Sequence, residues 1–225
     1  MRWVITGANR GIGLEFVRQL AARGDAVDAL ARTITGPLAE LADGERVRAV
    51  PCDVTSESSI AAALTTLGSA PVDVVVNNAG VMGKLQAFTE LDLADVTQTF
   101  EVNALGPIRV TRAFLPSLLR GKTRRVVSIT SGMGSIGDNT RGGAYGYRMS
   151  KAALNMAMKS LSIDYADQGI VAVVMNPGWV QTDMGGEGAP TPVETSVAMM
   201  LARIDGLTPS ENGTFLDYRG GSLTW

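Results

Sequence analysis

The chain of 225 residues is 45% hydrophobic and 19% charged, which is typical of a soluble globular protein with one domain, residues 1–225. Its net charge of −2 argues against a surface for nucleic acid or anionic membranes. The chain has no histidine, which excludes Ser-His-Asp and Cys-His catalysis and histidine-based zinc sites. We therefore predict no metal site and expect Tyr, Lys, Asp or Glu to carry any acid–base chemistry.

No apolar run reaches eighteen residues, so we expect no membrane span. A strand-like run begins at residue 2, so we expect no signal peptide and a cytoplasmic protein. The single cysteine, Cys52, ends an apolar run and is predicted to pack in the core without an internal disulfide partner.

Apolar runs alternate with helical patterns along the chain. Strands are predicted at 2–5, 26–31, 47–52, 72–76, 125–130, 170–175 and 213–217, and helices at 12–23, 57–68, 91–119 (with Gly106-Pro107 as a site for a break), 145–167 and 191–204. Buried strands separated by helices indicate βαβ units. The prediction is an α/β fold: a Rossmann-type doubly wound parallel sheet of about seven strands with helices on both faces.

The first predicted strand enters a glycine-rich turn, Thr6-Gly7-Ala8-Asn9-Arg10-Gly11-Ile12-Gly13, and an amphipathic segment follows. Glycine permits a tight turn, and backbone N–H groups at a helix N-terminus bind pyrophosphate. The spacing is G-x-x-x-G-x-G, which differs from the G-x-G-x-x-G fingerprint, and no Gly-Lys-Ser/Thr follows for a P-loop. A purely structural turn is the alternative at this point.

Tyr147 and Lys151 stand four residues apart, on one face of a predicted helix. A free tyrosine titrates near pH ~10. A cation one turn away favours the phenolate and lowers this pKa toward the range of a useful proton donor. A solvated lysine beside a packed tyrosine is the alternative for this spacing alone.

The polar and glycine-rich segments follow predicted strands, at 6–13, 52–54, 77–80, 130–135 and 176–184. In an open parallel sheet the ligand binds beyond the carboxyl ends of the strands. We therefore expect these segments to form one site.

In their order and spacing these motifs resemble the short-chain dehydrogenase/reductase family over nearly the whole chain. The resemblance implies a cofactor site built from five parts of the chain. The glycine-rich turn contributes Gly7, Asn9, Arg10, Gly11, Ile12 and Gly13, and the ends of the second and third strands contribute Arg32, Asp53 and Val54. The Asn77–Gly80 motif contributes Asn78, Ala79 and Gly80, the helix contributes Tyr147 and Lys151, and the nicotinamide segment contributes Pro177, Gly178, Val180 and Thr182. The segment from Tyr145 to Asn155 and the ending from Leu216 to Trp225 are similar to the C-factor/sniffer-type carbonyl reductase branch.

The resemblance implies four catalytic residues, Asn103, Ser131, Tyr147 and Lys151. Tyr147 would donate a proton to a substrate carbonyl oxygen, and Ser131 would donate a hydrogen bond to the same oxygen. Lys151 would lower the pKa of Tyr147 and bind the nicotinamide ribose. Asn103 would hold a water that relays protons, with an asparagine that only satisfies a local carbonyl as the alternative.

The interval from Ser131 to Tyr147 departs from the family pattern. It spans sixteen residues here, against about thirteen in the family, so extra residues are expected to loop out near 138–143. Ser135 is therefore an alternative hydroxyl, although Ser131 is preferred because it directly follows a predicted strand. Tyr145 is an alternative phenol, but Met149 and not a lysine lies four residues beyond it, which favours a pocket wall.

The cofactor prediction rests on the end of the second strand, which reads Leu30-Ala31-Arg32-Thr33 and has no acid for the NAD ribose. Arg32 and Arg10 are suited to pair with a 2′-phosphate, so we predict NADP(H) in preference to NAD(H). Asp28, in the middle of the strand, has no explanation in this scheme.

The predicted function is an NADP(H)-dependent oxidoreductase that acts on a small-molecule carbonyl or alcohol, without nucleic-acid or membrane partners and with homo-oligomerisation left open. The alternative is a regulatory protein that binds a dinucleotide without turnover. The seven residues from Met184 to Pro190 include three glycines and predict a short, mobile lid. Trp179, Met133, Met184 and Tyr145 indicate an apolar pocket, with core packing as the alternative.

Overall fold

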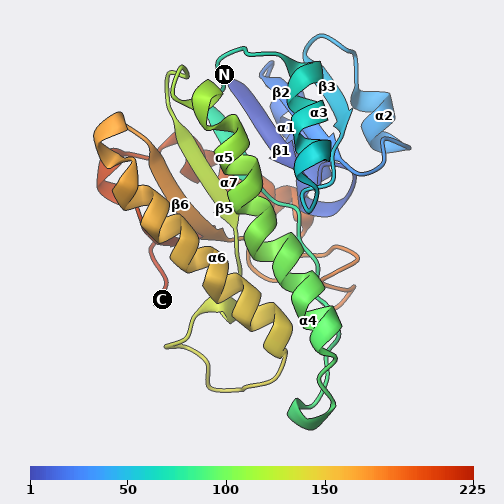
Figure 1. The fold of residues 1–225 in the computed structure, drawn as a ribbon, viewed down its shortest axis with the longest axis vertical. Helices are drawn as coiled ribbons and strands as arrows, with labels where there is room; N and C mark the ends of the chain where they lie inside the picture. Colours follow the sequence, from blue (N-terminus) through green and yellow to red (C-terminus); the bar gives the residue numbers. More distant parts are fainter.

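The computed structural model describes residues 1–225 and is built on a seven-stranded parallel sheet in the order β3-β2-β1-β4-β5-β6-β7. Its strands are β1 (Arg2–Thr6), β2 (Ala26–Ala31), β3 (Val47–Pro51), β4 (Val74–Asn77), β5 (Arg125–Ile129), β6 (Val171–Asn176) and β7 (Phe215–Asp217). All neighbouring strands pair in parallel. The predicted fold class is confirmed (Figure 1).

Most helices lie where the sequence predicts them: α1 (Gly11–Ala22), α3 (Glu57–Leu67), α6 (Tyr145–Asp164) and α7 (Val193–Asp205). The helix α2 (Pro37–Leu41) was not predicted, because five residues are too short to show a helical period. None of the helices is both long and apolar enough to cross a bilayer.

The long helix expected at 91–119 is divided, but not by a break at Gly106-Pro107. It consists of α4 (Leu93–Phe100) and α5 (Gly106–Leu118), joined by the π-helical turn Glu101–Leu105. Pro107 is the second residue of α5 and directly follows the π-helical turn. Because proline has no N–H, it removes one hydrogen bond of the continuing helix at this point. π-Helical turns of this kind are frequent at functional sites.

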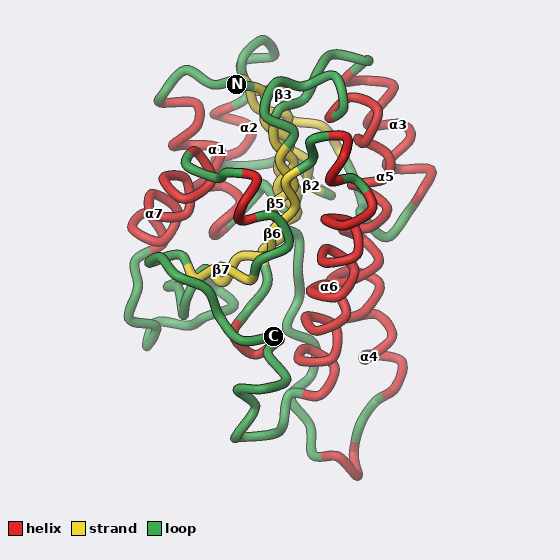
Figure 2. Tube along the Cα trace, turned by 90° about the vertical axis from the view of Figure 1, so that its left-hand side faces the viewer, coloured by secondary structure: helices red, strands yellow, loops and turns green.

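Two hydrophobic cores lie on opposite faces of the sheet. One core unites Trp3 and Ile5 of β1 with α1, α2 and α7, and the other unites Val4 with α3, α5 and α6. Figure 2 shows the sheet edge-on between these two helical layers. Because successive side chains of a strand point to opposite faces, each strand serves both cores and reads as a continuous apolar run. Cys52 is buried as predicted, and burial raises the pKa of its thiol to about 11.

Asp28 is explained by its two neighbouring strands. It is only 3% exposed, and its carboxylate pairs with Arg2 of β1 at 2.9 Å and with Arg48 of β3 at 2.7 Å. A buried charge is tolerated when it is paired in this way. Asp28 therefore fastens the sheet at mid-strand and is not a ribose ligand.

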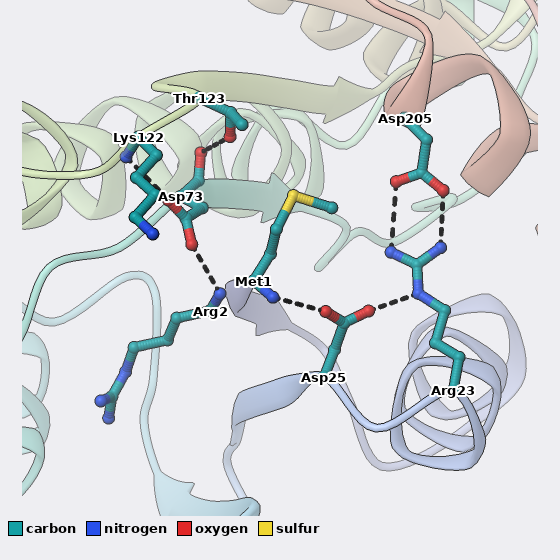
Figure 3. Close-up of polar contacts among 8 residues, drawn as sticks. All are labelled: Met1, Arg2, Arg23, Asp25, Asp73, Lys122, Thr123 and Asp205. Carbon is teal, nitrogen blue, oxygen red and sulfur yellow. Dashed lines mark hydrogen bonds and ion pairs between the residues drawn. The ribbon is translucent and has the colours of Figure 1, made fainter.

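The amino-terminal edge of the sheet is held by Asp73 (Figure 3). Its carboxylate accepts hydrogen bonds from the backbone N–H groups of Arg2 and Lys122, each at 2.8 Å, and its carbonyl accepts one from Thr123 Oγ1 at 3.0 Å. This residue therefore joins the beginnings of β1, β4 and β5.

A second set of polar contacts lies beside it (Figure 3). Asp25 pairs with the N-terminal amine of Met1 at 2.7 Å and with Arg23, and Arg23 also pairs with Asp205 at 2.7 Å. These contacts connect β1 to the ends of α1 and α7. Both polar sets lie at the amino ends of the strands, opposite the carboxyl ends where the ligand of an open parallel sheet binds.

Replacing Asp73 with alanine should lower the free energy of unfolding by about 2–3 kcal/mol, because two backbone N–H groups lose their acceptor. Asp73→Asn keeps one acceptor oxygen, so its free energy of unfolding should lie between those of the wild type and Asp73→Ala. Urea denaturation measures both. The control is Asp167→Ala at an exposed position, for which we expect a change within about 0.5 kcal/mol. Equal losses for Asp73→Ala and Asp167→Ala would contradict this role.

Candidate active site

A cavity of about 690 Å³ opens at the carboxyl ends of the strands. This volume lies within the range of small-molecule and cofactor sites. Most of the predicted site residues line it: Gly7, Asn9, Arg10, Gly11, Ile12, Arg32, Asp53, Val54, Asn78, Ala79, Gly80, Tyr147, Lys151, Pro177 and Thr182. Five predicted residues, Gly13, Asn103, Ser131, Gly178 and Val180, are not part of its lining.

The glycine-rich turn forms the floor of this cavity. Gly7 has φ +65°, and a Cβ there would lie 2.9 Å from the Cα of Ala79. A Cβ on Gly13 would lie 2.2 Å from the carbonyl oxygen of Gly7. Gly13 therefore lets α1 pack beneath the turn without touching the cavity, while Gly7, which lines the cavity, lets the turn approach Ala79 closely. This arrangement fits the pyrophosphate of a dinucleotide at the N-terminus of α1.

Thr6 joins this turn to the segment that follows β4. Its Oγ1 accepts hydrogen bonds from the backbone N–H groups of Asn78 at 2.9 Å and Ala79 at 3.0 Å, and Asn78 Nδ2 donates to the Thr6 carbonyl at 2.9 Å. The sequence analysis did not assign this role. A threonine that ends a buried strand is the only local signal for it, because the partners lie more than seventy residues away.

Polar groups lie around the cavity beside β2 and β3. Asp53 accepts hydrogen bonds from the backbone N–H of Thr55 at 2.9 Å and from its hydroxyl at 2.7 Å, and these bonds hold the pKa of Asp53 below its usual value. Arg32 is exposed on the cavity wall. Arg10 pairs across the cavity with Asp183 at 3.1 Å, and both side chains are exposed. The two arginines are thus accessible to an anionic ligand.

Tyr147 and Lys151 meet in a buried environment, at 8% and 4% exposure. Lys151 Nζ donates a hydrogen bond to the carbonyl of Ile129 at 2.9 Å and lies 5.7 Å from the centre of the Tyr147 ring. Burial lowers the pKa of Lys151 from 10.5 to about 8. The pair is therefore a built feature of the cavity wall and not a solvated surface contact.

The expected lowering of the Tyr147 pKa by Lys151 is not found. Burial raises the pKa of Tyr147, and a hydrogen bond with Ser131 only partly opposes this effect. The lysine lies over the face of the ring and is engaged by the Ile129 carbonyl, and the surrounding core removes the water that would stabilise a phenolate. Tyr147 is consequently a neutral phenol at physiological pH, which is the form that donates a proton.

The structure distinguishes the two candidate hydroxyls. Ser131 lies two residues beyond β5, its hydroxyl lies near enough to Tyr147 to lower the pKa of the phenol, and its Oγ accepts from the Met133 N–H at 3.1 Å. Ser135 is buried, and its Oγ accepts from the Asp138 N–H at 3.1 Å within the following turn. Ser131 and not Ser135 is thus brought to the phenol.

The alternative phenol also lies elsewhere. The ring of Tyr145 packs against that of Phe88, with 5.3 Å between the ring centres. Neither residue lines the cavity. Tyr145 therefore belongs to an aromatic contact outside the Tyr147–Lys151 pair.

Asn103 lies in the π-helical turn and is fully buried. Its Oδ1 accepts from the Val81 N–H, and its Nδ2 donates to the Val81 carbonyl, both at 2.8 Å. Nδ2 also donates to Ser150 Oγ at 3.0 Å, and Ser150 donates to the carbonyl of Tyr147 at 2.8 Å. The side-chain amide is thus occupied by local groups, as in the alternative explanation, and it supports the backbone beside Tyr147.

The segment after β6 borders the cavity through Pro177 and Thr182. Gly178 has φ +81°, and a Cβ there would lie 2.6 Å from the ring of Tyr218. Val180 is buried and forms a β-bridge with Thr191. Gly178 and Val180 therefore hold this segment in place from behind.

Within the predicted lid, the main chain at Gly185 is held by hydrogen bonds and close packing. Thr182 Oγ1 accepts from the Gly185 N–H at 3.2 Å, and Trp179 Nε1 donates to the Gly185 carbonyl at 2.8 Å. A Cβ on Gly185 would lie 2.0 Å from the Val180 carbonyl, so this glycine serves close packing. The lid therefore contains a hydrogen-bonded turn at Gly185, whereas a Cβ on Gly186 or Gly188 would meet nothing within 4 Å. The expected mobility of the lid without cofactor stays a prediction.

The residues expected to form an apolar pocket do not gather there. Met184 lines the cavity, whereas Trp179 is 60% exposed and, like Met133 and Tyr145, is absent from the lining. The cavity has further walls that were not predicted: Ala31, Thr33, Cys52, Thr55, Val81, Gly83, Asp95, Gln98, Thr99, Val102, Ile129, Thr130 and Asp183. Three of them, Cys52, Thr130 and Asp183, lie within the segments 52–54, 130–135 and 176–184 that the sequence predicts to form the site, although they were not named as cofactor contacts.

The fold and this site define a dinucleotide-binding oxidoreductase. Residues 2–192 match the family model described as short chain dehydrogenase. The chain belongs to the short-chain dehydrogenase/reductase family and is an NAD(P)-dependent oxidoreductase.

Three relatives show where in the family it lies. The chain is 55% identical to the C-signal of Myxococcus xanthus over 161 residues, which are 72% of this chain and 97% of that protein. The structure of NADPH-bound carbonyl reductase from chicken fatty liver has a TM-score of 0.92 and 34% identity, covering 100% of this chain and 98% of that one. The carbonyl reductase Sniffer of D. melanogaster has a TM-score of 0.91 and 32% identity, covering 100% and 99%. The predicted family and branch are confirmed.

The buried lysine should make stability depend on pH. Lys151 titrates at about 8 in the folded protein and at 10.5 when solvated, so the unfolded chain binds more protons between these values and stability rises with pH across that window. The unfolding free energy of the wild type minus that of Lys151→Met should therefore increase by about 2 kcal/mol from about pH 7 to about pH 9.5.

Urea denaturation at several pH values measures this difference. Lys122→Met, at an exposed position, is the control and should leave the pH profile unchanged. Parallel profiles for the wild type and Lys151→Met would contradict the burial of a titrating lysine.

Proposed function

We propose that this protein is an NADP(H)-dependent carbonyl reductase that acts on small carbonyl compounds through Asn103, Ser131, Tyr147 and Lys151. The single observation that carries the proposal is the buried pair of Tyr147 and Lys151 in the cavity wall, 5.7 Å apart from ring centre to Nζ. Burial raises the pKa of Tyr147, and Ser131 lowers it in part. Structural neighbours described as carbonyl reductases, one of them with NADPH bound, support it.

The residues have distinct roles in this proposal. A bound nicotinamide dinucleotide supplies the hydride chemistry. Tyr147 donates its phenolic proton to the carbonyl oxygen of the substrate, and Ser131 donates a hydrogen bond to the same oxygen as negative charge develops there. Lys151, one turn along α6, binds the nicotinamide ribose in this proposal, and its Nζ lies 5.7 Å from the centre of the Tyr147 ring.

Asn103 has a positioning role. Through Val81 and Ser150 it connects the segment after β4 to the main chain at Tyr147. Gly80 lies between the π-helical turn and α6, because a Cβ there would be 3.3 Å from Asn103 Oδ1 and 3.6 Å from Lys151 Nζ. The absence of a side chain at Gly80 keeps this space open next to the lysine.

Arg10 and Arg32 support NADP(H) as the preferred cofactor. Both line the cavity, and β2 ends without an acidic residue at the cavity wall, since Asp28 is engaged at mid-strand. Guanidinium groups bind phosphate in a bidentate manner that a ribose hydroxyl cannot match. Arg10 exchanges its partner Asp183 for the 2′-phosphate in this proposal.

Tyr147→Phe should lower turnover of a carbonyl substrate by about 10²–10⁴-fold, because the general acid is lost while the ring still packs. NADPH binding should be nearly unchanged. Steady-state kinetics and a fluorescence titration measure the two effects. Tyr145→Phe is the matched control and should retain most of the wild-type turnover. A Tyr147→Phe variant with a third of wild-type turnover would refute the assignment.

Arg32→Ala and Arg10→Ala should each weaken NADPH binding by about tenfold or more, the value of one charge-assisted hydrogen-bonded contact, and should change NADH binding little. The measurement is the dissociation constant of each cofactor at moderate salt. Arg141→Ala, at an exposed position, controls for the loss of positive charge. Wild-type protein that binds the two cofactors equally would contradict the assigned preference.

A regulatory role is the second candidate, and the identity of 55% with a protein named C-signal is the observation that favours it. A protein of this kind would bind a dinucleotide as a signal and would need no proton donor. NADPH consumption with a panel of aldehydes, ketones and quinones separates the two functions. Tight NADPH binding without reduction of any member would support the regulatory role.

A further inference from the structure

The chain turns back on itself after β7. Gly220 and Gly221 have φ values of +112° and +78°, which permit the reversal. Ser222 then forms an antiparallel bridge with Leu216, and the Leu223 N–H donates to the carbonyl of Phe215 at 2.7 Å. The segment 222–225 therefore lies against the edge strand of the sheet.

Trp225 fixes the far part of this segment. Its ring lies 5.5 Å from the ring of Phe215, which is only 1% exposed and belongs to the core beneath α6. An aromatic pair of this geometry adds about 0.5–1.5 kcal/mol beyond the area it buries. The main chain at 224–225 is thus held at a defined place and is not a loose tail.

The loop that connects Ser131 to α6 has two different halves. Its first half is packed on α6, because a Cβ on Gly134 would lie 2.9 Å from Lys151 Cβ and Asn155 Nδ2 donates to the Gly134 carbonyl at 3.3 Å. The second half, residues 136–143, is exposed, and Ile136 is 78% exposed. This second half includes the residues by which the loop exceeds the family pattern.

The second half is attached to the rest of the fold at each end. At its end, Arg148 Nε donates to the carbonyl of Gly142 at 3.1 Å. At its beginning, the Gly137 N–H donates to the carbonyl of Trp225 at 3.0 Å, and a Cβ on Gly137 would lie 2.9 Å from Thr224 Cγ2. Figure 1 shows the red end of the chain descending beside this loop.

The backbone that follows the Gly142 attachment is strained at one residue. Ala144, the residue before α6, has φ +47°, a left-handed conformation that costs a non-glycine residue about 1–2 kcal/mol. Tyr147 lies three residues further on, in the first turn of α6. A loop held less firmly would relax here and shift the proton donor relative to a substrate.

We propose that segment 222–225, and Trp225 in particular, is a positioning element that holds the loop between Ser131 and Tyr147 in its productive place. The inference rests on the proposed reductase function. The segment lies beyond residues 2–192, which match the family model, so it is separate from what the family model describes. No residue of 132–146 or 219–225 lines the main cavity. We therefore expect the segment to act on the reaction through the position of Tyr147, with little effect on cofactor binding.

The first test compares Trp225→Ala with Trp225→Phe. The alanine variant loses the ring contact with Phe215 and should show a kcat/KM for a carbonyl substrate lowered by about five- to fiftyfold, the size of effect expected when remote contacts position reacting groups. Its NADPH dissociation constant should stay within about twofold of the wild type. The phenylalanine variant keeps an aromatic ring and should restore most of the loss.

A second pair of variants tests the contact from the loop side. Gly137→Ala places a methyl group against Thr224 Cγ2 and should reproduce the loss, and Thr224→Ser in the same chain removes Cγ2 and should restore activity. Hydrogen exchange of residues 136–143 should accelerate in Trp225→Ala and Gly137→Ala and return to the wild-type rate in the rescued chain.

The outcomes separate this inference from the proposed function. Unchanged exchange in residues 136–143, or equal losses of NADPH binding and kcat/KM, would overturn the positioning role. Faster exchange with unchanged kcat/KM would also overturn it, because the loop would then be held without consequence for the reaction. A wild-type protein that reduces no carbonyl would refute the proposed function, whatever the exchange shows.

Discussion

The hydroxyl of Thr6 is the contact on which the site depends. It accepts hydrogen bonds from the N–H groups of Asn78 and Ala79, and so joins β1 to β4 where the strand order reverses. In doubly wound sheets this reversal creates the crevice in which the ligand binds. The close approach of Gly7 to Ala79 and the packing of Gly13 beneath it both require the two segments to stay together. The cavity floor is therefore set by one side chain at a strand end.

The chemistry depends on burial more than on the spacing of two residues. A lysine one turn from a tyrosine lowers the tyrosine pKa when both are solvated. Here the core surrounds the pair, so the pKa of Lys151 falls to about 8 while that of Tyr147 rises. Both shifts favour uncharged groups, and a neutral phenol beside Ser131 is suited to donating a proton.

The substrate side of the molecule is organised differently from the cofactor side. The cofactor cavity is built from strand ends and short turns that pack closely, including the lid around Gly185. The loop after Ser131 is long and exposed, and its position rests on contacts with Trp225 and Arg148. The cavity therefore rests on contacts between strand ends, whereas the 131–144 loop rests on contacts with the C-terminal segment and with α6.

The sequence by itself determined the alternation of strands and helices, the fold class, and the positions of the motifs, because apolar periodicity and glycine-rich turns are local properties of a chain. It also determined the Tyr147–Lys151 pair, since four residues on a helix lie on one face. The sequence also favoured Ser131 over Ser135, because Ser131 directly follows a predicted strand. The tertiary structure added the reason on the side of Ser135, whose Oγ accepts from the Asp138 N–H.

The other differences between the sequence-based expectations and the structure also come from contacts between residues distant in sequence. Asp28 is explained by Arg2 and Arg48 on neighbouring strands, and the direction of the Tyr147 pKa shift follows from burial that no local pattern reveals. Gly185 in the lid packs on the Val180 carbonyl, a contact that the glycine content of the segment does not reveal. Local sequence determines which groups the chain carries and on which element each one lies. Their partners, their solvation and hence their chemistry are decided by residues distant in sequence that only the folded chain brings together.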